Sequence, residues 1–170
     1  TGASSNATPI VMKTTDGGTT WQHTFLSANN QNVRTGWSGQ SGDSQWSYGE
    51  VVMSASVSEF DPNRIAISDF GFVHASTDGG ATWQQCYTHR QSTHSAGAAT
   101  PTKQAYRGIG LENTSCWQVF WIGNQRLFGA YSDIKGIIST DGGKKWSFDY
   151  SGPLQNTTYR IARHNTNGML

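Results

Sequence analysis

Charged residues are scarce in this 170-residue sequence, and long apolar runs are absent. Twelve Lys and Arg residues nearly balance eleven Asp and Glu residues, giving a net charge of +1. Such a balance offers no electrostatic footprint for nucleic acid or for an anionic membrane surface. No apolar run is long enough to cross a bilayer, so we expect no membrane span. Long Ala, Leu, Glu and Lys tracts are also missing, which argues against a helical protein.

Cysteine is limited to Cys86 and Cys116. Two thiols do not make a disulfide framework, and neither they nor the five histidines show the spacing of a metal site. We therefore expect no metal and no cofactor. The sequence leaves two states open for the cysteines, which are a disulfide in an oxidising compartment or two unpaired thiols on different strands.

The residues that are abundant suit strands and turns. Thr, Val, Ile, Trp and Tyr favour strands, and the 20 glycines favour turns. Aromatic residues make up 12% of the chain and provide enough apolar surface for a core. This composition predicts an all-β fold.

One octapeptide occurs three times without gaps, as Ser/Thr-Thr-Asp-Gly-Gly-x-x-Trp at residues 14–21, 76–83 and 139–146. We call these segments box 1, box 2 and box 3. The box tryptophans are Trp21, Trp83 and Trp146, so they lie 62 and then 63 residues apart. Self-similarity at a nearly fixed period indicates a repeat architecture.

Each box is predicted to be a structural turn rather than a catalytic motif. Asp-Gly-Gly favours a tight hairpin because glycine adopts positive φ without a steric penalty. The box aspartates can accept hydrogen bonds from nearby backbone amides, and the Ser or Thr two residues earlier can add another. The tryptophan starts the outgoing strand and can pack beneath the turn. The three aspartates are Asp16, Asp78 and Asp141.

This pattern resembles the Asp-box, or BNR, repeat of sialidases, xyloglucan-cleaving glycoside hydrolases, sortilin-type receptors and a photosystem assembly factor. In those families the box links the third and fourth strands of a β-propeller blade. The resemblance implies an all-β propeller, and it is more specific for the fold than for the function.

The chain is therefore divided into two complete four-stranded blades and two complementary half-blades. The blades cover residues 50–87 and 116–150, and the half-blades cover 9–26 and 158–170. The sum is three blades, whereas closed propellers usually have four to eight. We expect an incomplete propeller whose remaining blades come from a longer chain or from other subunits. The longer chain is favoured because residues 169–170 end inside a predicted strand.

Two long connections between blades are candidate binding loops, since long loops in compact domains are often functional. They run over residues 27–49 and 88–108. Exposed rings can stack on sugar rings, and neighbouring polar groups can bind the hydroxyls. The alternative is that the aromatic residues only anchor the loops. The candidate ligand-binding residues are Trp37, Trp46, Tyr48, Glu50, Tyr106 and Arg107.

Asp69 and Asp133 occupy equivalent turns, nine and eight residues before their box aspartates. Two carboxylates across a cleft could act as general acid and base in glycoside hydrolysis. The alternative, which we favour, is that each aspartate caps its own turn. The resemblance favours a xyloglucanase-like over a sialidase-like enzyme, if the protein is an enzyme at all.

Asn113 and Asn156 begin glycosylation sequons. Together with the resemblance they predict a secreted or extracytoplasmic protein. The first functional hypothesis is a propeller segment that binds or acts on a polysaccharide or other glycan. The alternative is a non-catalytic propeller that binds proteins or forms part of a larger extracellular assembly.

Overall fold

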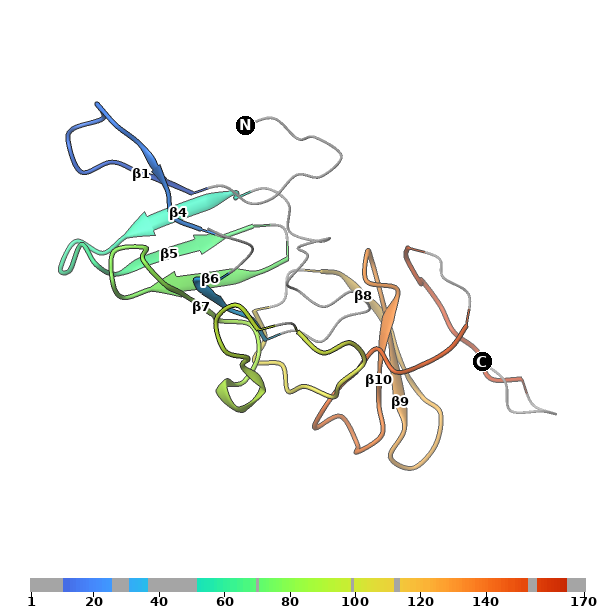
Figure 1. Cartoon of the computed structure of the whole chain (residues 1–170). Coiled ribbons are helices and arrows are strands. Elements are labelled where there is room, and N and C mark those ends of the chain that lie inside the picture. Colours follow the sequence, from blue (N-terminus) through green and yellow to red (C-terminus); the bar gives the residue numbers. More distant parts are fainter. Residues whose placement is uncertain are drawn as a thin grey trace.

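The computed structural model describes residues 11–25, 31–36, 52–69, 71–98, 100–111, 114–152 and 156–164. These residues form three β-sheets, and their one helical element is the short 3-10 turn η2 (Arg90–Ser92) (Figure 1). Within these ranges, no helix has the length and apolar character needed to cross a membrane. The predicted all-β fold is confirmed.

The middle sheet is an antiparallel meander of β4 (Ser54–Val57), β5 (Ile65–Ser68), β6 (Val73–Ser76) and β7 (Trp83–Gln85). These strands follow the order and the approximate positions expected for the blade at residues 50–87. Box 2 forms the connection between β6 and β7, as the repeat predicts.

A fifth strand extends this sheet, which the sequence pattern did not predict. β3 (Val33–Arg34) pairs in parallel with β7 and gives the order β3-β7-β6-β5-β4. The Trp83 amide donates to the Asn32 carbonyl over 2.8 Å. The segment from 27 to 49 was expected to be only a loop, but part of it returns to cover the outer edge of the middle sheet. An edge strand left uncovered would expose unpaired backbone groups.

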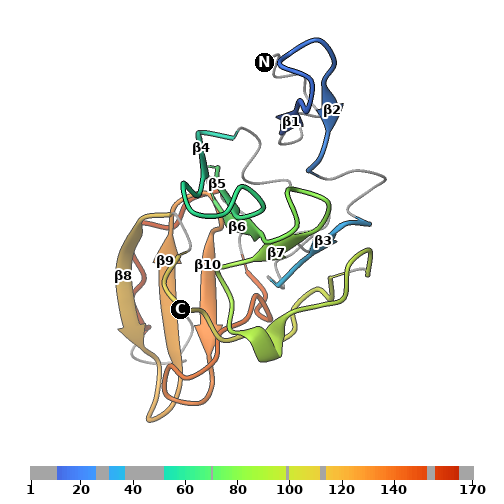
Figure 2. The same ribbon diagram turned by 90° about the vertical axis from the view of Figure 1, so that its left-hand side faces the viewer.

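The third sheet consists of β8 (Cys116–Trp121), β9 (Leu127–Tyr131) and β10 (Gly136–Ser139), all antiparallel (Figure 2). The fourth strand expected at 145–150 is reduced to isolated bridges. Ser147 pairs with Ile138, and Trp146 pairs with Tyr106 on the other side. The segment after box 3 therefore connects β10 to the preceding interblade connection.

The N-terminal half-blade is the two-stranded sheet of β1 (Met12–Lys13) and β2 (Gln22–His23), joined by box 1. At the other end, residues 158–164 form no strand, in contrast to the expected half-blade. Instead, the Thr158 amide donates to the Tyr131 carbonyl, and the Ile161 amide donates to the Gln118 side chain. A strand requires a paired neighbour, and the predicted neighbour at 168–170 lies outside the described residues.

The three boxes fold in the same way. In box 2, the Ser76 hydroxyl accepts the Gly80 amide at 2.9 Å, and the Asp78 carboxylate accepts the Thr82 amide at 2.9 Å. The indole N–H of Trp83 donates to the Gly80 carbonyl at 3.1 Å. The same three bonds recur in box 1 and box 3, at 2.8 to 3.1 Å. The prediction of a structural turn closed by its own Asp, hydroxyl and Trp is confirmed.

The glycines are required for this turn. Gly79 and Gly80 have φ of 69° and 90°, and the equivalent pairs in box 1 and box 3 also have positive φ. A side chain would strain two successive residues in that region. Hydrogen bonding to the Thr20 side chain and amide lowers the pKa of Asp16 to about 2, so this box carboxylate stays ionised at ordinary pH.

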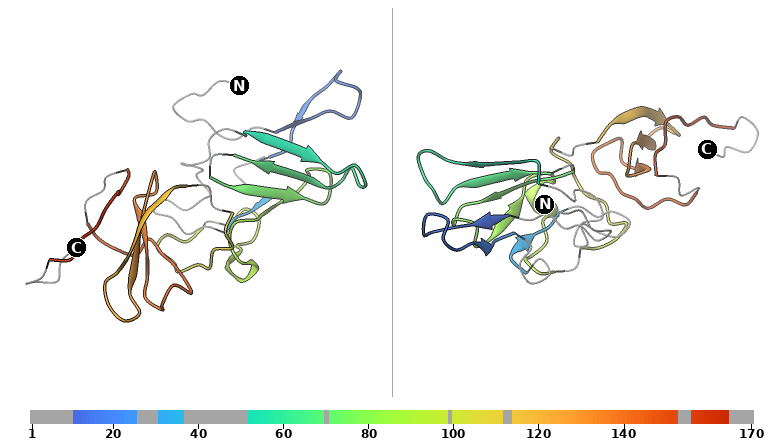
Figure 3. Two further views of the ribbon diagram at one scale, coloured as in Figure 1. Left: turned by 180° about the vertical axis from the view of Figure 1, so that it is seen from behind. Right: turned by 90° about the horizontal axis from the view of Figure 1, so that it is seen from above.

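The main core lies in the middle blade. Phe25, Phe72, Trp83 and Tyr87 are almost fully buried and surround His74, whose ring lies 4.9 Å from that of Phe25. Burial lowers the pKa of His74 to about 3, so the imidazole is neutral in the folded protein. Figure 3 shows the connecting segment between the middle and third sheets, and Ile137 of β10 belongs to the same buried cluster as Phe72 and Tyr87.

Candidate ligand-binding cleft

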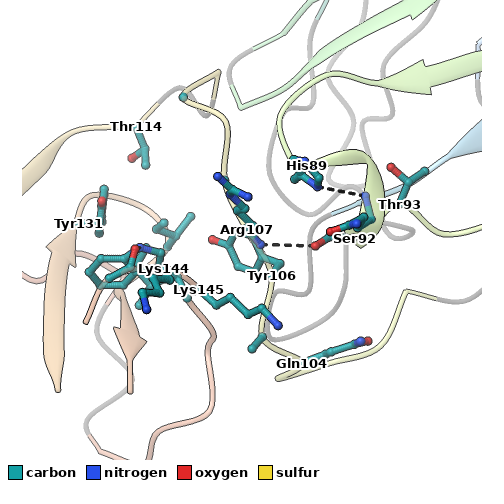
Figure 4. A pocket seen from close by; sticks show the side chains of 18 of the residues that line it. His89, Ser92, Thr93, Gln104, Tyr106, Arg107, Thr114, Tyr131, Lys144 and Lys145 are labelled. Atoms are coloured by element: carbon teal, nitrogen blue, oxygen red, sulfur yellow. Dashed lines mark hydrogen bonds between the residues drawn. The ribbon is translucent and has the colours of Figure 1, made fainter. Parts of the chain in front are cut away.

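A cleft of about 1090 Å³ opens between the middle blade and the third blade (Figure 4). One wall is the connection after β7, the opposite wall is box 3, and the floor includes Phe72 and Tyr106. The cleft thus lies where the interblade connection predicted to bind ligands meets a box turn. Its polar lining side chains include His89, Ser92, Thr93, Gln104, Arg107, Lys144 and Lys145.

The first wall is held in place by the buried amide of Gln85. Its Oε1 accepts the amides of Tyr87 and Thr88 at 2.9 and 2.7 Å. Its Nε2 donates to the Thr88 carbonyl at 2.9 Å and to the Thr93 hydroxyl at 2.8 Å. The partners in all four bonds are Tyr87, Thr88 and Thr93, which lie just before or within the loop that lines the cleft. Because Gln85 is itself buried, it fixes this loop to the end of β7.

The η2 turn continues the same wall. The His89 Nδ1 accepts the Gln91 amide at 3.3 Å, and the Ser92 hydroxyl accepts the Arg107 amide at 3.4 Å (Figure 4). The His89 amide also donates to the Arg107 carbonyl at 2.8 Å. These bonds bring two parts of the 88–108 connection together at the cleft.

The two blades are tied together by residues 106–109. Thr88 pairs with Gly108 on the middle-blade side, and Tyr106 pairs with Trp146 through two backbone bonds of 2.8 Å on the third-blade side. The Tyr106 ring stacks on Phe148 with centroids 6.4 Å apart. This shared segment positions Arg107 between the walls of the cleft (Figure 4).

Of the six predicted ligand-binding residues, the structure brings Tyr106 and Arg107 together in this cleft. Tyr106 is buried, so it provides part of the floor, whereas Arg107 is exposed. Trp37, Trp46, Tyr48 and Glu50 lie outside the described residues. The binding role of all six stays a prediction.

Asp69 caps its own turn. One of its carboxylate oxygens accepts the amides of Gly71 and Phe72 at 2.8 and 2.6 Å. Burial raises the pKa of Asp69 to about 6, although these two hydrogen bonds act in the opposite direction. Asp69 does not line the cleft, although its neighbours Gly71 and Phe72 do.

Asp133 also takes part in a turn, between β9 and β10. It is exposed, has a φ of 61°, and accepts a bond of 3.1 Å from the Asn156 side chain. It too is absent from the lining of the cleft. The hydrogen bonds of Asp69 are those of the turn-capping alternative, whereas the Asp133 carboxylate bonds to the distant Asn156. Their catalytic pairing stays a prediction.

Cys86 and Cys116 are free thiols in the structure, so the disulfide that the sequence left open is not formed. Cys116 is exposed at the start of β8, and burial raises the pKa of the Cys86 thiol. Asn156 is exposed, as a glycosylation acceptor must be, and Asn113 lies outside the described residues. Among the residues described, no group of three His, Cys, Asp or Glu could hold a metal ion.

Several lining residues were not among the predicted site residues. In the repeat pattern Lys144 and Lys145 occupy the variable positions of box 3, and Gln104 and Thr93 belong to no motif. A comparison of the three boxes could have identified the two lysines, because box 1 has Thr-Thr and box 2 has Ala-Thr at the positions of Lys144 and Lys145. The contribution of a box turn to a cleft depends on how neighbouring blades pack, which the repeat alone does not specify.

The family model of the BNR/Asp-box repeat matches residues 137–148, which contain the whole of box 3. No curated protein matches the sequence. Among solved structures, YCF48 from Cyanidioschyzon merolae is similar, with 15% identity and a TM-score of 0.29. That match covers 91% of this chain and 57% of the other, so this chain spans little more than half the length of that structure.

Proposed function

We propose that this chain, an all-β segment with BNR/Asp-box repeats of the β-propeller type, is a carbohydrate-binding part of a secreted or extracytoplasmic protein. The glycan occupies the cleft between the middle and third blades. The rest of the ring comes from other blades, in a longer chain or in other subunits.

The observation that carries this proposal is the mixed lining of the cleft. The partly exposed Trp146 supplies ring surface, with the buried Phe72 and Tyr106 beneath it, while Ser92 and Gln104 supply hydrogen-bonding groups. A sugar presents apolar ring faces and a rim of hydroxyls, so a site that binds it needs both kinds of group. The volume of about 1090 Å³ is at the upper end of the range of small-molecule sites and suits several sugar units.

The proposal is for binding rather than hydrolysis. Asp69 bonds within its own turn, Asp133 bonds to the Asn156 side chain, and neither lines the cleft. A glycosidase needs two carboxyl groups on either side of the scissile bond. Within the described part of the chain, Asp141 is the one acidic residue that lines this cleft, and its carboxylate accepts the amides of Lys144 and Lys145.

The test is a screen of the native protein on a glycan array, followed by pull-downs with insoluble and soluble polysaccharides. Gln104→Ala removes an exposed lining side chain and is expected to weaken binding several-fold. Gln125→Ala, an exposed glutamine in the β8–β9 turn, is the matched control and should leave binding unchanged. An absence of glycan binding by the wild type would contradict the proposal.

A second candidate, a protein-binding or structural propeller, is favoured by the outer face of β8. Trp117, Val119 and Trp121 are each more than half exposed on alternate residues of this strand, and Tyr159 lies against Trp117 with ring centroids 5.1 Å apart. Rows of exposed aromatic residues mark contact surfaces. A further blade of the same propeller is the partner that suits this face. A partner co-purifying with the native protein and lost in W117A/W121A would support this second function.

A further inference from the structure

Positive charge is concentrated in the part of the chain that builds the third blade. Residues 100–170 contain eight of the twelve Lys and Arg residues but only four of the eleven Asp and Glu residues. The net charge of +1 therefore conceals a basic C-terminal part and an acidic N-terminal part. An uneven distribution of this kind attracts anions to one region even when the whole chain is nearly neutral.

Three of these cations line the interblade cleft. Arg107, Lys144 and Lys145 are all exposed and approach it from the connecting segment and from box 3 (Figure 4). In that view Lys145 extends from its wall toward the segment carrying Gln104. The salt bridges formed within the described ranges are Arg64–Asp61 and Lys103–Asp149, so none involves these three side chains.

The charge of Asp141 does not neutralise this cluster. Its Oδ1 already accepts the amides of Lys144 and Lys145 at 3.0 and 2.9 Å, as part of the turn. Hydrogen bonding by the Lys145 amide, and to a smaller extent the charge of Lys144, lowers the pKa of Asp141. Among the lining residues that the structure describes, one carboxylate thus faces three cations, and their net charge is positive.

The box turn itself does not need the lysines. At the position of Lys145, box 1 and box 2 have Thr20 and Thr82, whose hydroxyls donate to the box Asp at 2.6 and 2.5 Å. Lysine at this position gives up that hydroxyl bond to Asp141. The two lysines therefore add positive charge at the cleft in place of a bond that would stabilise the turn.

We propose that the cleft selects acidic polysaccharides, with sulfate or carboxylate groups of the polymer bound by Arg107, Lys144 and Lys145. This inference rests on the proposed carbohydrate-binding function and specifies its ligand class. The planar guanidinium of Arg107 can form two parallel bonds to an oxyanion, and the two ammonium groups act as point charges. The ring surfaces and hydroxyls of the cleft bind the sugar itself.

The experiment measures affinity for matched pairs of neutral and charged polymers, with the whole chain in its native assembly. The pairs are dextran with dextran sulfate, and fully methyl-esterified pectin with pectate. Poly-L-glutamate is the acidic polypeptide control. We expect one or both charged polysaccharides to bind at least about tenfold more tightly than the neutral partner, and added salt to weaken that binding.

The key variant is K144A/K145T, which gives box 3 the residues of box 2 at both positions. Both side chains are exposed and the backbone bonds to Asp141 are retained, so the fold is expected to persist. Binding to the charged polymer should fall at least about tenfold, to the level of the neutral polymer. The control R64A/R163A removes two exposed cations away from the cleft and lowers the net charge equally, so binding should change less than about twofold.

The outcomes separate this inference from the proposed function. Equal binding of neutral and charged polysaccharides would overturn the acidic selectivity and leave carbohydrate binding intact. Binding of no polysaccharide would overturn both. Equal binding of poly-L-glutamate, or equal losses in K144A/K145T and R64A/R163A, would show that general charge attraction accounts for the effect, and would also overturn the inference.

Discussion

The two junctions between successive blades pack differently, although the same box motif lies at each. At the first junction, Trp83 of box 2 is only 1% exposed, and its indole donates both to Gly80 and, at 2.9 Å, to the Thr24 carbonyl of the preceding half-blade. The Phe25 ring meets it edge-on, with centroids 5.4 Å apart. At the second junction, Trp146 is only partly buried and lies beside an open cleft.

The residues four positions after the first two box tryptophans also have different ring partners. Phe25 follows Trp21 by four residues and packs against the next blade's box, whereas Tyr87 follows Trp83 by four residues and packs within its own blade. The Tyr87 ring lies 4.6 Å from that of Phe72. At the second junction Tyr106 stacks on Phe148 instead, and the cleft beside Trp146 stays open. Identical turn motifs can thus have a fully buried tryptophan at one junction and a partly exposed tryptophan beside a larger open cleft at the next.

The largest effect that tests this comparison is expected from removing the box tryptophans one at a time. Trp83→Ala should lower the free energy of unfolding by about 3–5 kcal/mol, because a fully buried indole leaves a cavity. Trp146→Ala should cost less, and Trp21→Ala should cost least, because Trp21 is 56% exposed. Chemical denaturation of the three variants gives the order. Equal losses would show that the two junctions are packed equally well.

The next largest effect is expected from Gln85, which holds the wall of the second junction. Gln85→Ala removes four hydrogen bonds of a buried amide and should cost about 2–4 kcal/mol. It should also weaken polysaccharide binding, because the loop at 88–93 loses its anchor.

The neighbouring Gln84→Ala is the matched control, since the Gln84 amide is half-buried and makes one bond, to the Gln85 carbonyl. Thermal unfolding and binding should both be nearly unchanged in this variant. A loss of binding in Gln84→Ala as large as that in Gln85→Ala would contradict the anchoring role.

A third prediction concerns pH and the core at the first junction. His74 has a folded-state pKa of about 3, below the ordinary value near 6.5, so the unfolded chain takes up a proton first as the pH falls. The stability that neutral His74 contributes is present above pH 6.5 and is lost progressively between pH 6.5 and 3. Between pH 6.5 and 4.5 the loss from this group is about 2 kcal/mol.

Asp69 acts in the opposite direction. Its folded-state pKa of about 6 lies above the ordinary 3.8, so the folded protein takes up the proton first and gains stability as the pH falls from 6 toward 3.8. Replacing His74 with Leu should therefore give a protein whose free energy of unfolding rises on mild acidification. Asp69→Asn should instead make the free energy of unfolding fall more steeply as the pH is lowered. Denaturation curves of both variants from pH 7 to 4.5 give the free energy of unfolding at each pH. A pH dependence equal to that of the wild type in both variants would refute the roles assigned to His74 and Asp69.

The smallest effect is expected from Lys145→Thr at the second junction. The new hydroxyl can donate to Asp141 as Thr20 and Thr82 do to their box aspartates. Because the turn is exposed, stability should rise by only about a few tenths of a kcal/mol. Binding of an acidic polymer should fall at the same time. A gain in both stability and binding would contradict the assigned role of Lys145.

The sequence was most informative where structure depends on local bonds. The box hydrogen bonds, the four-strand order of the middle blade and the hairpin of β1 and β2 all follow from short-range patterns. The sequence was less informative where a contact joins distant residues. β3 has only two residues and pairs with a strand 50 residues later, so it leaves no periodic pattern.

The cleft could not be predicted for the same reason. Phe25 and Tyr87 occupy equivalent positions in the repeat, and nothing in their local sequence shows that one packs outward and the other inward. The basic character of the cleft was visible in principle, because Lys144 and Lys145 interrupt an otherwise uniform box. These lysines form a cluster of cations only together with Arg107, which lies almost 40 residues away in the sequence. The pairing of Tyr106 with Trp146 brings Arg107 to the same cleft.

The most direct test of ligand binding at the open junction is amide hydrogen exchange with and without dextran sulfate. Binding in the cleft predicts slower exchange at residues 104–108 and 142–146, with no change over residues 79–83, around the buried Trp83 of the first junction. Protection confined to β8, or equal protection at both junctions, would contradict the account.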